Sequence, residues 1–160
     1  MKNFLINIFV LLSTVAFAEE VVYIKTFAHL KISAVTFTVE KSSYQIIADD
    51  NLLLKNSGEV MLKLGVVNDS VEVKSADKIY GRFKTVKFNA ENGTGELRLK
   101  LVSPERKPRI YQDNYIVTVE NGLLKLINEV KLDVYIAGVV EAESGTHSMP
   151  EFYKVQAILA

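Results

Sequence analysis

The sequence predicts an α+β protein in which a predominantly antiparallel β region is followed by a hairpin and two helices. Three observations support this fold class. Residues 21–102 alternate mainly with period two, and turn-forming residues separate short apolar runs. Asn121 and Gly122 then lie between two further apolar runs, which is the strongest local signal for a β-hairpin. From Leu132 onward, apolar residues recur with the period of a helix.

Residues 1–18 have the pattern of a secretory signal peptide and are left out of the fold prediction. Lys2 supplies the positive charge, residues 4–15 form an apolar core, and residues 16–18 form a small-residue cleavage site. The apolar core has about 12 residues, whereas a membrane span needs about 20. We therefore expect an exported protein, in the periplasm, the cell envelope or the medium, with no membrane span after signal cleavage.

The composition argues against several classes of partner and site. Lys and Arg number 19 and Asp and Glu number 19, so no basic excess favours nucleic acid as a partner. The chain has no cysteine, which excludes a disulfide framework and a lipid anchor attached through cysteine. His29 and His147 are too few and too far apart to indicate a zinc site. No metal and no cofactor is evident.

Strands are expected in the segments that are rich in β-branched and aromatic residues between turn signals. These segments are residues 21–27, 32–39, 44–48, 52–55, 60–67, 70–73, 78–88 and 96–102. Residues 49–51 are a turn signal, so the segments on either side of them should form a hairpin. Residues 103–109 contain two of the three prolines and four charged residues, which predicts a linker or long crossing loop.

The C-terminal part begins with a hairpin of residues 115–119 and 123–127. A helix from Leu132 follows, with Gly145 as its left-handed stop. A second helix is expected near Ser148, because Ser148 and Glu151 fit a capping box and Pro150 suits the first turn. The helical pattern still runs at the last residue, so we expect the sequence to be a fragment. We expect one domain, or one domain plus a small appendage, with residues 19–102 as its β-rich N-terminal part and 103–160 as the incomplete start of its core.

Glu143 is the unusual residue of the first helix. Leu132, Tyr135, Ile136, Val139 and Val140 form one apolar face, and at about 100° per residue Glu143 returns to that face while Glu141 points away. An apolar setting favours the protonated carboxyl group that a general acid needs. The alternative is that Glu143 lies in a frayed last turn and faces water.

The segment from residue 109 to the C-terminus resembles the SpoIID/LytB family, named after stage II sporulation protein D. Four blocks carry the resemblance: residues 109–114, residues 124–135, the run Gly138, Val139, Val140, Glu141, Ala142, Glu143, and residues 154–160. The β-rich part resembles the N-terminal half of the family more loosely. One departure is clear, because family members often carry Pro-Ser-Glu where this chain has Glu141, Ala142 and Glu143.

The resemblance implies a peptidoglycan lytic transglycosylase that cuts the muramic acid to glucosamine bond without water and leaves 1,6-anhydromuramic ends. The family's essential glutamate falls on Glu143. A single glutamate suffices if the muramic acid C6 hydroxyl is the nucleophile, and Glu141 is disfavoured as a partner because alternate helix positions do not face each other. The rest of the cleft would follow residue 160, so we expect this chain alone to be inactive.

Two further residues are candidate substrate-binding groups. Gln156 could orient a substrate group or the glutamate, although a helix glutamine is commonly solvated. Tyr135 could hydrogen-bond near Glu143, although an aromatic residue at this spacing is commonly core. Some SpoIID relatives bind zinc, with ligands that would lie after residue 160; His147 is a loop residue on this reading.

Three functions stay open at this point. The first is the transglycosylase, with peptidoglycan glycan strands as its substrate and other cell-wall hydrolases as further partners. The second is a peptidoglycan-binding protein without catalysis, or a modifier of a wall amidase. The third is a structural envelope protein, which would fail to bind purified sacculi.

Overall fold

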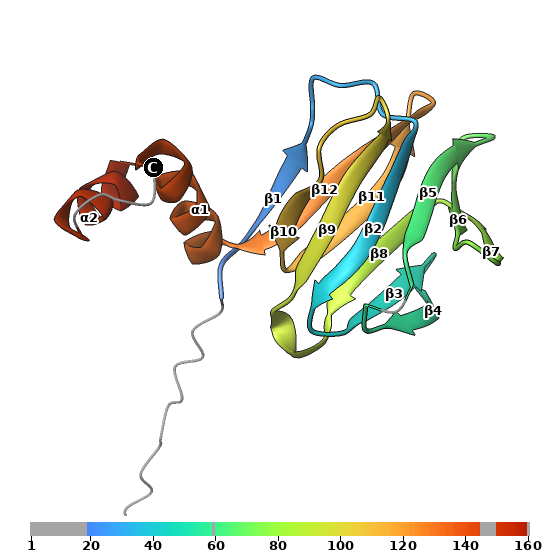
Figure 1. The fold of residues 1–160 in the computed structure, drawn as a ribbon, viewed down its shortest axis with the longest axis horizontal. Coiled ribbons are helices and arrows are strands. Elements are labelled where there is room, and N and C mark those ends of the chain that lie inside the picture. The colour runs from blue at the N-terminus through green and yellow to red at the C-terminus, as the bar shows by residue number, and fades with distance from the viewer. Residues whose placement is uncertain (1–18, 59, 145–149, 160) are drawn as a thin grey trace, which may run out of the picture.

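The described residues form two six-stranded antiparallel sheets and two C-terminal helices (Figure 1). The computed structural model describes residues 19–58, 60–144 and 150–159. The signal peptide expected at residues 1–18 lies outside these ranges. The observed arrangement confirms the α+β class with a predominantly antiparallel β region.

Each sheet combines strands from distant parts of the chain. The first sheet has the order β1 (Val21–Thr26), β12 (Leu123–Lys131), β11 (Asn114–Glu120), β8 (Thr85–Ala90), β3 (Tyr44–Ala48) and β4 (Asn51–Asn56). The second has the order β10 (Arg109–Gln112), β9 (Glu96–Ser103), β2 (Ala34–Lys41), β5 (Leu62–Val67), β6 (Ser70–Lys74) and β7 (Ile79–Phe83). Strands on both sides of position 102 therefore share the same sheets.

The apolar core lies between the two sheets. Along the central strands, buried residues alternate with partly exposed ones, as expected when one face of each strand packs inward. Phe37 on β2 and Phe88 on β8 stack with their ring centroids 4.4 Å apart, so one aromatic pair joins the second sheet to the first. Tyr115 on β11 meets Phe37 edge to face at 5.3 Å.

Both predicted hairpins are present. β3 and β4 pair across a turn in which Asp49 and Asp50 have φ of 45° and 65°. β11 and β12 pair across Asn121 and Gly122, with φ of 54° and 71°. Positive φ at both central residues is the geometry of a type I′ turn, which explains the Asn-Gly sequence.

Two details of the predicted β region are wrong. Residues 78–88 were expected as one strand, but the chain changes sheets at Lys84, between β7 and β8. The Asp49 carboxylate fixes this corner by accepting hydrogen bonds from the backbone N–H groups of Lys84 and Thr85, both at 2.9 Å. In addition, β10 was not predicted. It directly follows the proline-containing loop, and its pairing with β9 is what defines it as a strand.

The two predicted helices follow β12. α1 (Leu132–Ser144) and α2 (Pro150–Leu159) contact each other and project from one end of the sandwich (Figure 1). Gly145 and Ser148, the expected stop and cap, lie outside the described residues. No helix in the described ranges is long and apolar enough to cross a membrane.

Candidate active site

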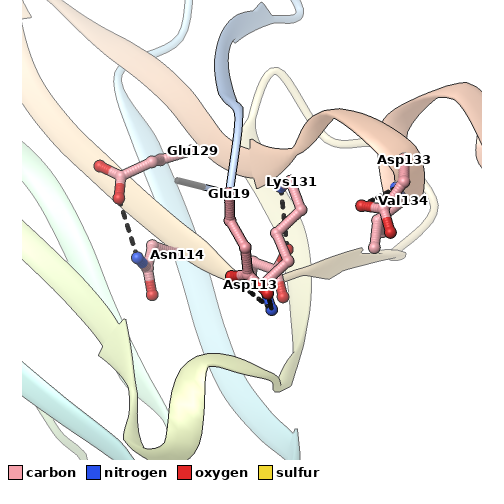
Figure 2. Close-up of polar contacts among 7 residues, drawn as sticks. All are labelled: Glu19, Asp113, Asn114, Glu129, Lys131, Asp133 and Val134. Carbon is pink, nitrogen blue, oxygen red and sulfur yellow. Dashed lines mark hydrogen bonds and ion pairs between the residues drawn. The ribbon is translucent and has the colours of Figure 1, made fainter. Parts of the chain in front are cut away.

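α1 starts directly where β12 ends, and polar contacts fix this junction (Figure 2). The Lys131 backbone N–H donates to the Asp113 carboxylate at 3.1 Å. The next N–H, of Leu132, donates to the Glu20 carbonyl oxygen at 2.9 Å. The Lys131 ammonium pairs with Glu19 at 2.9 Å, and this hydrogen bond raises the pKa of Lys131. The helix therefore leaves the sheet from an anchored point.

Asp113 is the centre of this junction. It is only 7% exposed and has φ of 61°, in the left-handed region that is strained for most residues. Its N–H donates to the Gly95 carbonyl oxygen at 2.9 Å, and its carbonyl oxygen accepts from the Tyr44 hydroxyl at 2.8 Å. Burial, together with the nearby Asp113 carboxylate, raises the pKa of Tyr44. Tyr44 of β3 and Gly95, just before β9, therefore hold the backbone of Asp113, whose carboxylate accepts from the last residue of β12.

A second set of bonds braces the strand that carries the helix. The buried Asn128 side chain donates to the carbonyl oxygens of Gln112 and Asn114, at 2.8 and 2.9 Å. The Asn114 side chain in turn donates to the Glu129 carboxylate at 2.9 Å (Figure 2). The end of β10 and the start of β11 are thus hydrogen-bonded to the last residues of β12. This places β10 beside the start of α1.

Several hollows border α1, and two of them are grooves of similar volume. The first, which we call the helix groove, lies between α1 and α2, has a volume of about 710 Å³ and is lined by residues that include Ile136, Val140 and Ala157. The second, which we call the sandwich groove, has a volume of about 660 Å³ and lies between α1 and strands β1, β9, β10 and β12. Glu141 lines both grooves.

Glu143 does not face a packed surface as the helical pattern predicted. It is exposed in the last turn of α1, and this corresponds to the alternative in which the carboxylate faces water. The reason is that α1 projects beyond the sheets, so that Val140 is buried while the following residues are uncovered in the described structure. Packing among the described residues therefore provides no apolar setting for Glu143.

Tyr135 is 38% exposed and lines the sandwich groove, so the expectation that it belongs to the core is wrong. It precedes Glu143 by eight residues, which corresponds to about 12 Å along the helix axis. The two side chains therefore cannot act on one atom. Gln156 lies on α2, and its side chain is outside the described structure.

The C-terminal segment matches a family model. The SpoIID family model, described as stage II sporulation protein, matches residues 120–160. This segment is therefore similar to the SpoIID family. The match begins at the β11–β12 turn and includes both α1 and α2. No curated protein and no solved structure matches the chain significantly.

The SpoIID segment contains Tyr135, Glu143 and Gln156. SpoIID proteins are associated with the cell wall, and the family includes lytic transglycosylases. Within the described residues, no group of three or more His, Cys, Asp or Glu side chains could hold a metal ion.

Several polar residues that line the sandwich groove were not predicted from the sequence, among them Glu96, Gln112 and Asn128. Gln112 stands in the first block of the family resemblance, which was a usable signal. Glu96 had no such signal, because only strand pairing brings it next to Gln112.

Proposed function

We propose that this chain is the sugar-cleaving part of an exported peptidoglycan lytic transglycosylase, with Glu143 as its acid and base. The observation that carries the proposal is the SpoIID match over residues 120–160, which includes α1 and Glu143. In this proposal residues 103–160 supply the chemistry and residues 19–102 the supporting β region. Export would follow from the signal peptide expected at residues 1–18.

The reaction needs one carboxyl group because the sugar supplies the nucleophile. Glu143 donates its proton to the oxygen that links muramic acid C1 to the next glucosamine, and the C1–O bond breaks. The muramic acid C6 hydroxyl attacks C1 and transfers its proton to the Glu143 carboxylate. The products are a 1,6-anhydro ring and a free glucosamine hydroxyl, and the carboxyl group is regenerated without water. Hydrolytic glycosidases differ in using two carboxyl groups.

The exposure of Glu143 suits a polymeric substrate. A glycan strand is too large for a closed cavity, whereas a carboxyl group at the open end of α1 is accessible to it. The bound sugar would then exclude water from the carboxyl group and favour its protonated form. We therefore propose that Glu143 acquires its apolar surroundings only when the glycan is bound.

The test is digestion of purified sacculi by the complete exported protein, with anhydromuramic products measured by mass spectrometry. Glu143→Gln removes the transferable proton and keeps the size of the side chain, so product formation should fall at least about a hundredfold. Glu105→Gln is the matched control, since Glu105 is an exposed carboxylate that pairs with Lys100 away from α1. Undiminished products from Glu143→Gln would refute the assignment.

A second candidate function is a peptidoglycan-binding protein that modifies a wall amidase without cutting glycan. The observation that favours it is the exposed Glu143 in a run that departs from the usual Pro-Ser-Glu. The same digestion separates the two functions. A protein that binds sacculi, releases no anhydro sugar and changes the rate of an added amidase is the second.

A further inference from the structure

The sandwich groove continues beyond α1. A neighbouring hollow of about 330 Å³ shares Glu96, Gln112 and Val134 with it and reaches Lys41. At its other end, the sandwich groove reaches Ala142, next to Glu143. The two hollows together form an elongated, open groove from the end of α1 to β2, a shape that suits a linear polymer.

A polar row crosses this groove. Gln112 on β10 is paired with Glu96 on β9, and Glu96 is paired with Lys41 on β2. Directly opposed residues of neighbouring strands have their side chains on the same face. The Lys41 ammonium lies 3.6 Å from the Glu96 carboxylate, and no hydrogen bond within the described chain engages the Gln112 side-chain amide. An amide and a carboxylate can accept from hydroxyl and acetamido groups, and the Gln112 amide can also donate.

Apolar surface lies beside the polar row. Tyr135 on α1 is 38% exposed and Ile110 on β10 is 52% exposed, and both line the sandwich groove. Binding sites for small units commonly combine apolar and aromatic walls with a few polar groups that fix orientation. Pyranose rings offer apolar C–H faces and polar rims, so this lining suits sugar units.

The charges in the groove argue against a phosphate-bearing chain. Glu96 and Glu141 both line it, and Lys41, the cation at its far end, is already paired with Glu96. Phosphate-bearing chains would meet like charge at these carboxylates. Uncharged units that donate hydrogen bonds would find acceptors there.

We propose that this groove binds the uncharged N-acetylglucosamine units of a glycan strand, so that the β-sandwich forms part of the glycan site. The acetamido N–H has carboxylate acceptors in the groove, and its methyl group has the apolar surface of Tyr135 and Ile110. The proposal rests on the proposed function, because the groove leads to the end of the helix that carries Glu143. It assigns substrate-positioning roles to Tyr135 and Gln112.

The test is binding of the β-1,4-linked N-acetylglucosamine hexamer to the complete exported protein by titration calorimetry. We expect saturable binding that weakens about tenfold in Tyr135→Ala and in Gln112→Ala. Cellohexaose, which lacks acetamido groups, should bind more weakly than the N-acetylated hexamer. Tyr23→Ala is the matched control, because Tyr23 is a 63% exposed tyrosine on β1 whose strand neighbour Ile24 is the one lining the groove.

Circular dichroism of each variant checks that the fold is retained. No saturable binding of the hexamer, preference for a polyphosphate chain, or equal affinities of the groove variants and Tyr23→Ala would overturn the proposal. Glu143→Gln separates the two proposals, since it should bind the hexamer normally while losing the lytic activity. If Glu143→Gln kept its lytic activity and the groove variants lost affinity, the transglycosylase assignment of Glu143 would fail and the groove would stand.

Discussion

Glu91 shows how a single carboxylate stabilises a sheet corner. It opens the short turn η1 (Glu91–Gly93) between β8 and β9. Lys55 pairs with its carboxylate at 2.8 Å, and the Ser43 hydroxyl and Gln45 amide donate at 2.5 and 3.2 Å. The hydrogen bond from Lys55, followed by those from Ser43 and Gln45, lowers the pKa of Glu91 to about 2.

The lowered pKa of Glu91 predicts a stability loss in acid. A carboxylate with a depressed pKa in the folded state stabilises the fold above its unfolded pKa, and this stabilisation is lost as the pH falls through the folded pKa. For Glu91 the window runs from about pH 4.5 down to about pH 2. Glu91→Gln should therefore be less stable at pH 7 and lose less stability across this window. Urea unfolding at several pH values measures the difference.

Lys55→Gln tests the cause of this shift. Removing the main partner should raise the pKa of Glu91 toward its ordinary value and move the acid-sensitive window upward. Parallel stability profiles for Glu91→Gln and the unsubstituted protein between pH 4.5 and pH 2 would contradict the argument.

At the candidate site, the sequence indicated which residues share a helical face but not what covers that face. The helical face that contains Val140 and Glu143 was readable from spacing, and Val140 is indeed buried. The exposure of Glu143 was not readable, because it depends on where α1 ends relative to the sheets. Helical periodicity indicates which residues share a face. It does not indicate how much of that face packs against other elements.

Elements defined by local turn signals were the most predictable. Asn121 and Gly122 specify the β11–β12 hairpin because few other residue pairs tolerate two positive φ values. The break at Lys84 was missed because its cause, the Asp49 carboxylate, is 35 residues away. β10 was missed for the same reason, since pairing with β9 defines it. The strand boundaries that hydrophobic period and composition do not define are set by contacts between residues that are distant in the sequence.

Gly138 gives a prediction at the level of α1. It lies in the interior of the helix, and a Cβ atom added there would meet no heavy atom within 4 Å. Gly138→Ala should therefore stabilise α1 by roughly 0.5–1 kcal/mol, since alanine loses less backbone entropy in a helix. Slower hydrogen exchange of the α1 amides is the expected observation. The reverse change at the neighbouring exposed position, Ala137→Gly, should speed exchange, and faster exchange in Gly138→Ala would disprove the prediction.

For the whole molecule, the Phe37–Phe88 stack is the most sensitive point, since it lies between the two sheets. Phe88→Ala removes a fully buried ring and leaves a cavity, so the free energy of unfolding should fall by about 3–5 kcal/mol. Chemical denaturation followed by circular dichroism measures the change. Tyr23→Ala removes an exposed ring of similar size and should change the stability by less than about 0.5 kcal/mol. A loss below about 1 kcal/mol for Phe88→Ala would show that the sheets do not depend on this pair.

The pairing of β1 with β12 governs the order in which the chain can fold. Val21 is opposite Lys131 and Thr26 is opposite Leu126, so the first strand to be synthesised pairs with the last. β1 therefore has no strand partner until the distant β12 reaches it. Closing a loop of this length before any contact rewards it is slow. The same closure brings the Glu20 carbonyl oxygen to the N–H of Leu132, so the start of α1 is anchored only after β1 and β12 have paired.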